Sequence, residues 1–353
     1  MTSLSGEQIT NVTDWEKIRR EELRYLLEHY AYGHRPVETP DKISFTVAEE
    51  KEVAGLQYKK IMIDADSFVL PIRVFIPKAD KPVPCFVYFM HNAQQISTDI
   101  ENEPNTLYIP IADIGKRGYA VTVIYFNDIY PDHKNLRTYD CGIFSHFGPF
   151  GDKRKDSDWA AIAAWAWCAS RAVDYLVTDP MIDADNLAVA GHSRGGKAAL
   201  WSGATDERFR LTISNSSGCM GAAMLRGKTG EHIDFISTHT DWLCRKQWCY
   251  ADCEEMFPVD QHMLLALIAP RLLYVQSSIL DDWSDPSAER RACKLAGEAY
   301  ALYGKDGLII SEEIEKDFGY HEGNIGYHVS TGEHKIRTND WEMFMNFWDK
   351  HRK

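Results

Sequence analysis

The sequence predicts an α/β protein with three layers, in which helices cover both faces of a mainly parallel sheet. Short apolar runs typical of buried strands alternate with segments whose apolar residues recur at helical spacing. This alternation predicts strands joined through helices, which makes neighbouring strands parallel and buries both faces of the sheet. In such a sheet, ligand sites gather at the carboxyl ends of the strands.

The elements are expected in a definite order along the chain. A helical segment at about residues 14–32 comes first. The expected strands are 42–50, 56–65, 70–78, 83–91, 118–126, 186–191, 211–218 and 271–278. Helices are predicted at 158–179, at 193–204 and from about Asp340 onward, and a long aromatic loop is expected between Asn127 and Asp158.

We predict a single domain across residues 1–353. The chain is long enough for one large core, and 44% of its residues are hydrophobic. It holds no repeat, low-complexity linker or shift in composition that would mark a boundary. We expect a helical and strand extension at about residues 1–60 and a polar, aromatic insertion at about residues 219–262.

The charge of the chain argues against a nucleic-acid partner, because the formal net charge is −13 and no basic face is visible. No apolar run is long enough to span a bilayer, so no membrane partner is expected. The first thirty residues hold no apolar run of the signal-peptide type. This predicts a cytoplasmic location for the chain as written, and a secreted or periplasmic one if a signal segment has been trimmed.

The eight cysteines show no disulfide-framework spacing. Cys85 and Cys168 lie in apolar segments, which indicates reduced, buried thiols. The spacing of Cys244, Cys249 and Cys253 fits no common zinc site. We therefore expect neither a metal nor another cofactor.

The stretch "NLAVAGHSRGGKAAL", residues 186–200, carries the main catalytic motif. Residues 191–195 fit Gly-x-Ser-x-Gly, with an apolar strand directly before and a helix directly after, which is the context of the nucleophile elbow in α/β-hydrolases. The sharp turn leaves no room for side chains two residues away, which explains Gly191 and Gly195. The Ser193 hydroxyl then projects above the sheet, and the backbone N–H of Arg194 can stabilise an oxyanion. A glycine-rich turn with an incidental serine is the alternative.

A serine nucleophile needs a base, and the base needs a carboxylate that fixes its tautomer. In α/β-hydrolases both follow the serine along the chain. Asp281 comes first in "ILDDWSDPSAE", after the strand "RLLYVQSS", with Asp282 and Asp285 close behind. His334 follows a glycine-containing turn after the last apolar strand and is the expected base. For His328, within a strand-like run, we expect a structural role.

Several stretches together resemble the bacterial glucuronoyl esterases of carbohydrate esterase family 15, over roughly residues 60–350. They are "RGYAVTVIYFNDIYPD", "DWAAIAAWAWCASRAVDYL", "GHSRGGKAALWSGATDERF", "DQHMLLALIAPRLLYV", "DDWSDP" and "IGYHVSTGEHKI". A Ser-Arg pair with a lysine three residues beyond the arginine is unusual among α/β-hydrolases. Members of this family cleave the ester between 4-O-methyl-glucuronic acid on xylan and a lignin alcohol. The resemblance implies a glucuronate ester of xylan or of a lignin–carbohydrate fragment as the substrate.

The resemblance implies catalytic roles by position. Ser193 would be the nucleophile and His334 the base, while Arg194 would complete the oxyanion hole with its side chain and its N–H. Some members carry a glutamate after the strand that follows the nucleophile helix. Here that stretch reads "ISNSSGCMG" and has no carboxylate. Asp281 is therefore expected to act alone as the acid partner.

The resemblance also implies substrate-binding roles. Lys197 would hold sugar hydroxyls, Glu231 resembles a substrate-binding glutamate, and Trp283 matches a tryptophan that packs on the sugar. A core role is the alternative for Trp283, because aromatic residues are often only packing. His192 stands where fungal relatives have a disulfide-forming cysteine, and we expect it to pack or to form a hydrogen bond beneath the turn.

Competing functions use the same residues differently. A carbohydrate acetyl esterase, of the acetyl xylan esterase type, would use the same triad with acetate as the acid half and the sugar as the alcohol. A non-catalytic binding protein with a hydrolase fold would not need the serine, the acid and the histidine together. A peptidase is disfavoured because nothing in the chain resembles a peptide-binding propeller or cap.

Overall fold

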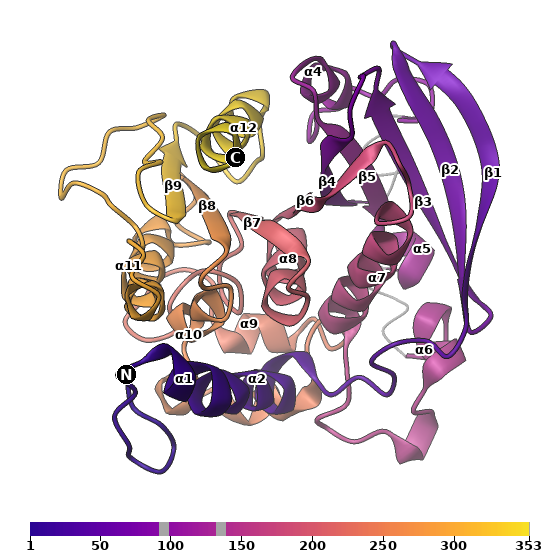
Figure 1. The fold of residues 1–353 in the computed structure, drawn as a ribbon. Helices are drawn as coiled ribbons and strands as arrows, with labels where there is room; N and C mark the ends of the chain where they lie inside the picture. Colours follow the sequence, from indigo (N-terminus) through magenta and orange to yellow (C-terminus); the bar gives the residue numbers. More distant parts are fainter. Residues whose placement is uncertain (92–98, 132–138, 353) are drawn as a thin grey trace.

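The computed structural model describes residues 1–91, 99–131 and 139–352. Within these residues one nine-stranded sheet has the order β1-β2-β3-β5-β4-β6-β7-β8-β9 (Figure 1). The strands are β1 (Ile43–Val53), β2 (Leu56–Ala65), β3 (Phe68–Pro77), β4 (Val83–Met90), β5 (Ala120–Tyr125), β6 (Ile182–His192), β7 (Phe209–Asn215), β8 (Leu272–Ser278) and β9 (Ile325–Ser330). From β5 to β9 all neighbours in the sheet are parallel, whereas β1, β2, β3 and β5 pair antiparallel. The predicted mainly parallel sheet is confirmed.

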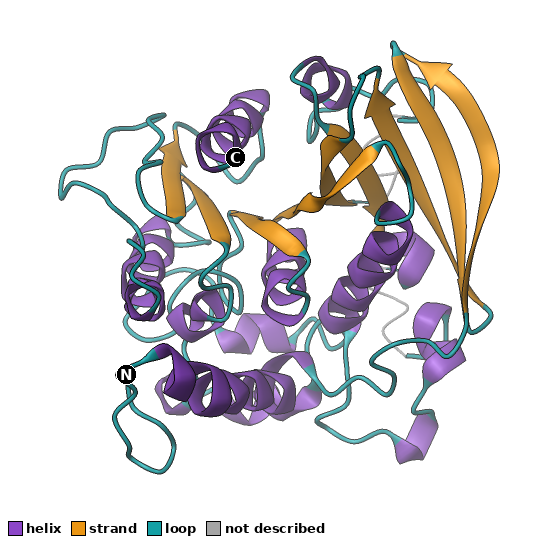
Figure 2. Cartoon of the chain, in the orientation of Figure 1, coloured by secondary structure: helices purple, strands orange, loops and turns teal. Residues whose placement is uncertain are grey.

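The helices pack against both faces of this sheet (Figure 2). They are α1 (Val12–Asp14), α2 (Arg20–Leu27), α4 (Ile111–Lys116), α5 (Phe126–Ile129), α6 (Gly142–Phe147), α7 (Ala161–Leu176), α8 (Arg194–Thr205), α9 (Ile233–Ser237), α10 (Gln261–Ala266), α11 (Pro286–Leu302) and α12 (Thr338–His351). The helical segment expected at 14–32 is present as α1 and α2 joined and extended by π-helical turns at 15–19 and 28–32.

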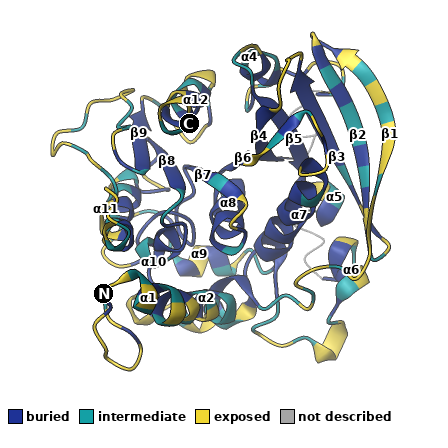
Figure 3. Cartoon of the chain, in the orientation of Figure 1, coloured by how far each residue is buried: buried dark blue, intermediate teal, exposed yellow. Residues whose placement is uncertain are grey.

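The alternation of side chains along the strands builds two cores, one on each side of the sheet. In β4, Val87 and Phe89 belong to the core under α7, α8, α10 and α11. Phe86 and Tyr88 belong to the opposite core, under α4 and α12. Figure 3 shows the central strands buried on both faces and the outer strand β1 largely exposed. A strand buried on both sides has no polar face, which is why the sequence there is a continuous apolar run.

The segments between the strands differ in how much regular structure they hold. The expected loop 127–158 contains the end of α5, α6 and a short 3₁₀ turn, and its residues 132–138 lie outside the described part of the chain. Residues 219–262 lie between β7 and β8 and contain α9, two 3₁₀ turns and the start of α10. Within the described residues, no helix is both long enough and apolar enough to cross a membrane.

The residues predicted to be catalytic follow the carboxyl ends of the parallel strands. Ser193 directly follows β6, Asp281 follows β8 and His334 follows β9. Because β6, β7, β8 and β9 are consecutive parallel neighbours, these ends meet at the same edge of the sheet. The topology therefore brings residues separated by up to 141 positions to one rim.

Candidate active site

Ser193 lies in a strained turn between β6 and α8. Its φ is +57° and its ψ −124°, a conformation that side-chain-bearing residues rarely adopt. Its N–H donates to the Asn215 carbonyl at 2.8 Å, which anchors the turn to β7. A Cβ on Gly191 would lie 2.1 Å from the Gly195 carbonyl oxygen, so no side chain fits at position 191. This geometry is that of a nucleophile elbow.

His334 and Asp281 form a close pair across the rim. His334 Nδ1 lies 2.6 Å from Asp281 Oδ2, and the Ser284 N–H donates to the other carboxylate oxygen at 3.2 Å. Asp281 is only 4% exposed. Burial by itself would raise the pKa of Asp281, but the hydrogen bond and charge of His334, together with Ser284, hold that pKa below its ordinary value. An ionised Asp281 keeps the proton on Nδ1 and leaves Nε2 able to accept one.

One cavity of about 250 Å³ brings Ser193 and His334 together. The other predicted residues that border it are Arg194, Lys197, Glu231 and Trp283, joined by Ser216, Ser217, Phe235, His239, Trp242 and Ser284. Asp281 lies behind His334 rather than on the cavity wall. In the described part of the chain, Ser193 Oγ and His334 are not hydrogen bonded to each other. Such bonds are often long without substrate and tighten when it binds.

Arg194 stands at the first position of α8, where the helix dipole is positive. Its guanidinium lies 4.8 Å from the centre of the Trp242 ring, and the Trp242 ring stacks on His239 at 4.0 Å. These aromatic contacts hold the cation against the cavity wall next to Ser193. Backbone N–H and guanidinium are thus both close to where an oxyanion would develop.

Lys197 and Glu231 form a buried ion pair at the base of the cavity. Lys197 Nζ donates to Glu231 Oε2 at 2.9 Å and to the Ser217 carbonyl at 2.8 Å. Glu231 Oε2 also accepts the Cys219 N–H at 3.1 Å. An ammonium group has three N–H donors, so one donor of Lys197 remains for a ligand. The pair offers a donor and an acceptor to hydroxyl groups in the cavity.

Trp283 lies at the rim of the cavity and is 47% exposed. Its ring meets Phe235 edge-to-face with the ring centres 4.8 Å apart, and its carbonyl accepts the Glu231 N–H at 2.8 Å. The alternative of a core tryptophan is wrong, because its exposed face is available for stacking on a ligand.

Two buried histidines, His192 and His91, lie near His334 and have lowered pKa values. His192 Nδ1 lies 2.5 Å from Asn215 Oδ1, and its ring centre is 4.7 Å from that of His334. Burial, followed by the nearby charges of His334 and His91, lowers the pKa of His192 to about 3. Burial and the charge of Arg194 lower the pKa of His91 to about 3 as well. Neutral neighbours do not repel an imidazolium forming on His334. His192 does form the hydrogen bond expected beneath the turn.

Glu289 of α11 is a functional candidate that sequence reasoning missed. It is fully buried; its Oε1 accepts the N–H groups of Ser217 and Gly218 at 2.8 and 3.0 Å, and its Oε2 accepts the Ser277 hydroxyl at 2.6 Å. Burial raises the pKa of Glu289 to about 7. By holding residue 217, Glu289 positions the carbonyl that binds Lys197. The sequence pattern that could have identified Glu289 is a single carboxylate among the alanines and other small residues at the buried positions of α11.

A second histidine–carboxylate pair lies in the core. His328 Nε2 is 2.9 Å from Asp340 Oδ1, and its Nδ1 is 3.0 Å from the Tyr274 hydroxyl. His328 and Asp340 are both fully buried and neither borders the Ser193 cavity. This arrangement fits the structural role expected for His328.

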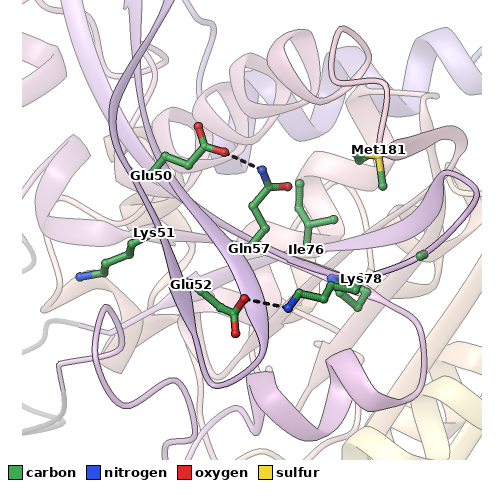
Figure 4. Close-up of a pocket in the computed structure, with 9 residues that line it drawn as sticks. Glu50, Lys51, Glu52, Gln57, Ile76, Lys78 and Met181 are labelled. Carbon is green, nitrogen blue, oxygen red and sulfur yellow. Dashed lines mark hydrogen bonds and ion pairs between the residues drawn. The ribbon is translucent and has the colours of Figure 1, made fainter.

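Another hollow, of about 550 Å³, lies beside the β1–β2 hairpin and the end of β3 (Figure 4). Several of its polar side chains are already engaged: Gln57 Nε2 donates to Glu50 at 2.6 Å and Lys78 Nζ lies 2.8 Å from Glu52. It holds none of the predicted site residues. The chemistry therefore points to the smaller cavity at Ser193.

Comparisons with known proteins show the family to which this chain belongs. A family model described as fungal glucuronyl esterase matches residues 73–304. A carbohydrate esterase of an unknown prokaryotic organism is 34% identical over 99% of this chain and 88% of its own length. A 4-O-methyl-glucuronoyl methylesterase of Wolfiporia cocos is 26% identical over 85% of this chain and 70% of its own.

Solved structures share the whole fold. A promiscuous family 15 carbohydrate esterase from a marine bacterial metagenome superposes with a TM-score of 0.88 at 32% identity, covering 99% of this chain and 95% of that one. A glucuronoyl esterase from Solibacter usitatus superposes with a TM-score of 0.89 at 30% identity, covering 100% and 96%. These likenesses confirm the predicted α/β-hydrolase fold. The chain thus belongs to the glucuronoyl esterases, carbohydrate esterase family 15, and is a carboxylic ester hydrolase.

Proposed function

We propose that this chain hydrolyses esters of glucuronic and 4-O-methyl-glucuronic acid, such as lignin–carbohydrate ester links, through Ser193, His334 and Asp281. One observation carries the proposal: a single cavity is bordered by a strained serine, an imidazole bonded to a buried carboxylate, and a buried lysine–glutamate pair. The serine and the imidazole can carry out acyl transfer. The lysine–glutamate pair can bind the hydroxyl groups of a polyhydroxylated acid. Relatives named 4-O-methyl-glucuronoyl methylesterases support the same substrate class.

The reaction proceeds in two steps. Ser193 Oγ attacks the ester carbonyl while His334 Nε2 takes the hydroxyl proton, and Asp281 stabilises the imidazolium. The N–H and guanidinium of Arg194 stabilise the oxyanion of the tetrahedral intermediate. His334 then gives its proton to the departing alcohol, leaving the uronoyl group on Ser193. Water, deprotonated by His334, hydrolyses this acyl-enzyme and releases the uronate.

The cavity favours a uronic acid over acetate as the acid half of the ester. The ring hydroxyls of a uronate can accept from Lys197 and donate to Glu231, and the sugar face can stack on Trp283. An acetyl group has no hydroxyl for this buried pair. The site would then bind acetate esters without using its most specific groups.

The test compares hydrolysis of benzyl glucuronate with acetate release from acetylated xylan. We expect clearly faster turnover of the glucuronate ester, and loss of that turnover in Ser193→Ala with unchanged thermal unfolding. Equal or faster acetate release would make the chain an acetyl esterase. Full turnover by Ser193→Ala would contradict a mechanism in which Ser193 is the nucleophile.

A further inference from the structure

A cavity of about 510 Å³ lies at the edge of the sheet opposite to the active site. Arg210 is the second residue of β7, Arg271 directly precedes β8 and Asn324 directly precedes β9. Asp281 and His334, in contrast, follow the carboxyl ends of β8 and β9. Because β8 has 7 residues, about 20 Å of strand separate the two edges. The cavity shares no lining residue with the active-site cavity.

Four cationic side chains border this cavity, each from a different segment. They are Arg210 in β7, Arg271 before β8, Lys305 in the loop after α11 and Lys350 near the end of α12. Among the described residues that line the cavity, none is an aspartate or a glutamate. The chain as a whole carries a formal net charge of −13, so this local excess of positive charge runs against its composition. Cations grouped in this way repel one another, and a bound anion relieves that repulsion.

Two of the four cations have no partner at all within residues 1–91, 99–131 and 139–352. The Lys305 ammonium forms neither a hydrogen bond nor an ion pair there, and the same holds for the Arg210 guanidinium. Arg210 Nε is also buried, so water does not satisfy this N–H. A buried donor without an acceptor is unfavourable and calls for an explanation, such as a ligand. Lys350, in contrast, is paired with Glu322, which lies outside the cavity lining.

Arg271 adds a third positive charge that no carboxylate contacts. Its hydrogen bonds within the described chain all go to backbone carbonyls, those of Gly203 at 2.6 Å, Phe209 at 2.9 Å and Asp206 at 3.2 Å. These bonds use three of its five N–H donors and fix the guanidinium in place without neutralising it. Burial, followed by the charge of Arg20, lowers the pKa of Arg271. An arginine nevertheless remains protonated, so the charge persists.

The charges and the size of the cavity indicate the class of ligand. A singly charged carboxylate would compensate only one of the three cations. A tetrahedral oxyanion with two negative charges compensates two of them and presents several acceptor oxygens to guanidinium donors. The side-chain amide of Asn324 can supply a further N–H donor. A cavity of this volume also has room for an organic group that carries the oxyanion.

We propose that the cavity at the amino ends of β7, β8 and β9 binds a doubly charged tetrahedral oxyanion, the chemistry that inorganic phosphate, sulfate and a phosphate monoester share. Arg210 and Lys305 contact its oxygens, and Arg271 supplies the third positive charge. The proposal is independent of the ester that Ser193 hydrolyses, because the two sites lie at opposite edges of the sheet.

Isothermal titration calorimetry of the full chain at pH 8 and low ionic strength tests this site. The probes are inorganic phosphate, sulfate, glucose 6-phosphate and the singly charged dimethyl phosphate. We expect a Kd below about 1 mM for the doubly charged probes. Dimethyl phosphate should bind about tenfold more weakly, because it compensates one cation fewer. Arg210→Gln should weaken phosphate binding about tenfold through the loss of charge-assisted hydrogen bonds. Lys305→Gln should weaken it about threefold.

Lys153→Gln is the matched control, because Lys153 is an exposed cation in the turn 151–153, outside the cavity. It should leave the Kd for phosphate unchanged. Arg194→Met should leave that Kd unchanged too, because it alters only the active-site cavity. Thermal unfolding verifies the fold of every variant. Turnover of benzyl glucuronate by Arg210→Gln should equal that of the wild type.

The order of affinities identifies the source of the oxyanion. Tighter binding of glucose 6-phosphate than of inorganic phosphate would support a phosphate monoester as the ligand, and the reverse order would support a free ion. Equal affinity for dimethyl phosphate and inorganic phosphate would overturn the requirement for two charges.

Three results for the variants would overturn the site itself. Phosphate binding that is unchanged in both Arg210→Gln and Lys305→Gln would exclude this cavity. Equal weakening by Lys153→Gln and Arg210→Gln would assign binding to general attraction by surface cations. Loss of phosphate binding in Arg194→Met would assign it to the active site. Failure of Ser193-dependent ester hydrolysis would contradict the proposed function alone and leave this site unaffected.

Discussion

His334 Nδ1 lies 2.6 Å from Asp281 Oδ2, although 53 residues separate the two side chains in the sequence. The carboxylate is buried and the imidazole is partly exposed, so Asp281 lies in the protein interior while His334 reaches the open cavity. A buried acceptor at Nδ1 gives the histidine one tautomer and one orientation.

Replacing Asp281 by asparagine should therefore lower kcat for benzyl glucuronate by about ten-thousandfold, because the amide can donate to Nδ1 and stabilise the wrong tautomer. Steady-state kinetics measure this, with thermal unfolding to verify the fold. Asp282→Asn is the matched control: its exposed carboxylate follows directly in the chain, and kcat should stay within twofold. Similar losses of kcat in both variants would contradict a specific role for Asp281 as the partner of His334.

Arg194→Met should reduce kcat far more than it raises KM. In the proposed mechanism the guanidinium beside Ser193 stabilises charge that exists only in the tetrahedral intermediate, and losing one such stabilising group costs roughly 3 kcal/mol of barrier, or about a hundredfold in rate. Kinetics over a range of ester concentrations separate the two parameters. A change confined to KM would mean that Arg194 binds the ground state of the substrate instead.

Substitutions of Lys197 and Glu231 should have strongly non-additive effects on the free energy of unfolding. Removing one member leaves a buried charge without its partner, so Lys197→Met and Glu231→Gln should each cost about 3 kcal/mol or more. The double variant should lose less than the sum of the two, because neither charge is then left alone. Denaturant unfolding of all four proteins gives the coupling energy. Additive losses would show that the two side chains act independently.

Glu289 should make stability fall as pH rises. Burial holds its pKa at about 7 in the folded protein, against 4.5 as the ordinary value, so the folded chain keeps a proton that the unfolded chain has lost. This favours folding below about pH 4.5, and the advantage is lost as pH rises through 7, with a total of about 3 kcal/mol. Unfolding by urea at pH 5 and pH 8 measures the change.

Glu289→Gln is the comparison for that measurement. The amide oxygen can still accept from Ser217 and Gly218, but the side chain no longer ionises. The pH-dependent loss should therefore be smaller in this variant than in the wild type by about the same amount. An identical pH profile in both proteins would assign the effect to other groups.

Gly191→Ala should abolish or severely reduce folding, because the new Cβ would lie 2.1 Å from the Gly195 carbonyl oxygen. Gly297→Ala in α11 is the control, since its Cβ would meet its nearest neighbour at an ordinary 3.7 Å. That change should be neutral or stabilise the helix by up to about 1 kcal/mol. Equal soluble yields and melting temperatures for the two variants would contradict the close approach at the elbow.

Part of the site could be predicted from local pattern alone. The strand–turn–helix context of Ser193 requires only the residues beside it, because glycines are needed wherever the chain turns this sharply. His334 and Asp281 could be expected from their order after the serine, since parallel strands present their carboxyl ends together. The resemblance to the family implied two placements for the acid, and the absence of a carboxylate after β7 then favoured Asp281.

Other residues of the site had no comparable signal. Glu289 reaches the loop after β7 from a helix 71 residues away, and only packing shows which backbone N–H groups it meets. His192 and His91 are neutral because the tertiary fold buries them beside other positive charges. Burial and the distances between side chains depend on how the whole fold packs, so the hydrophobic periodicity of the sequence does not predict them.

The sequence by itself determined the layered α/β architecture, the sharp serine turn and the order of the chemical groups, because each depends on spacing or on residues adjacent in the chain. Only the tertiary structure decided that Lys197 and Glu231 form a buried pair and that burial raises the pKa of Glu289 to about 7. These features depend on which surfaces pack together and which stay in water, and no local pattern encodes that.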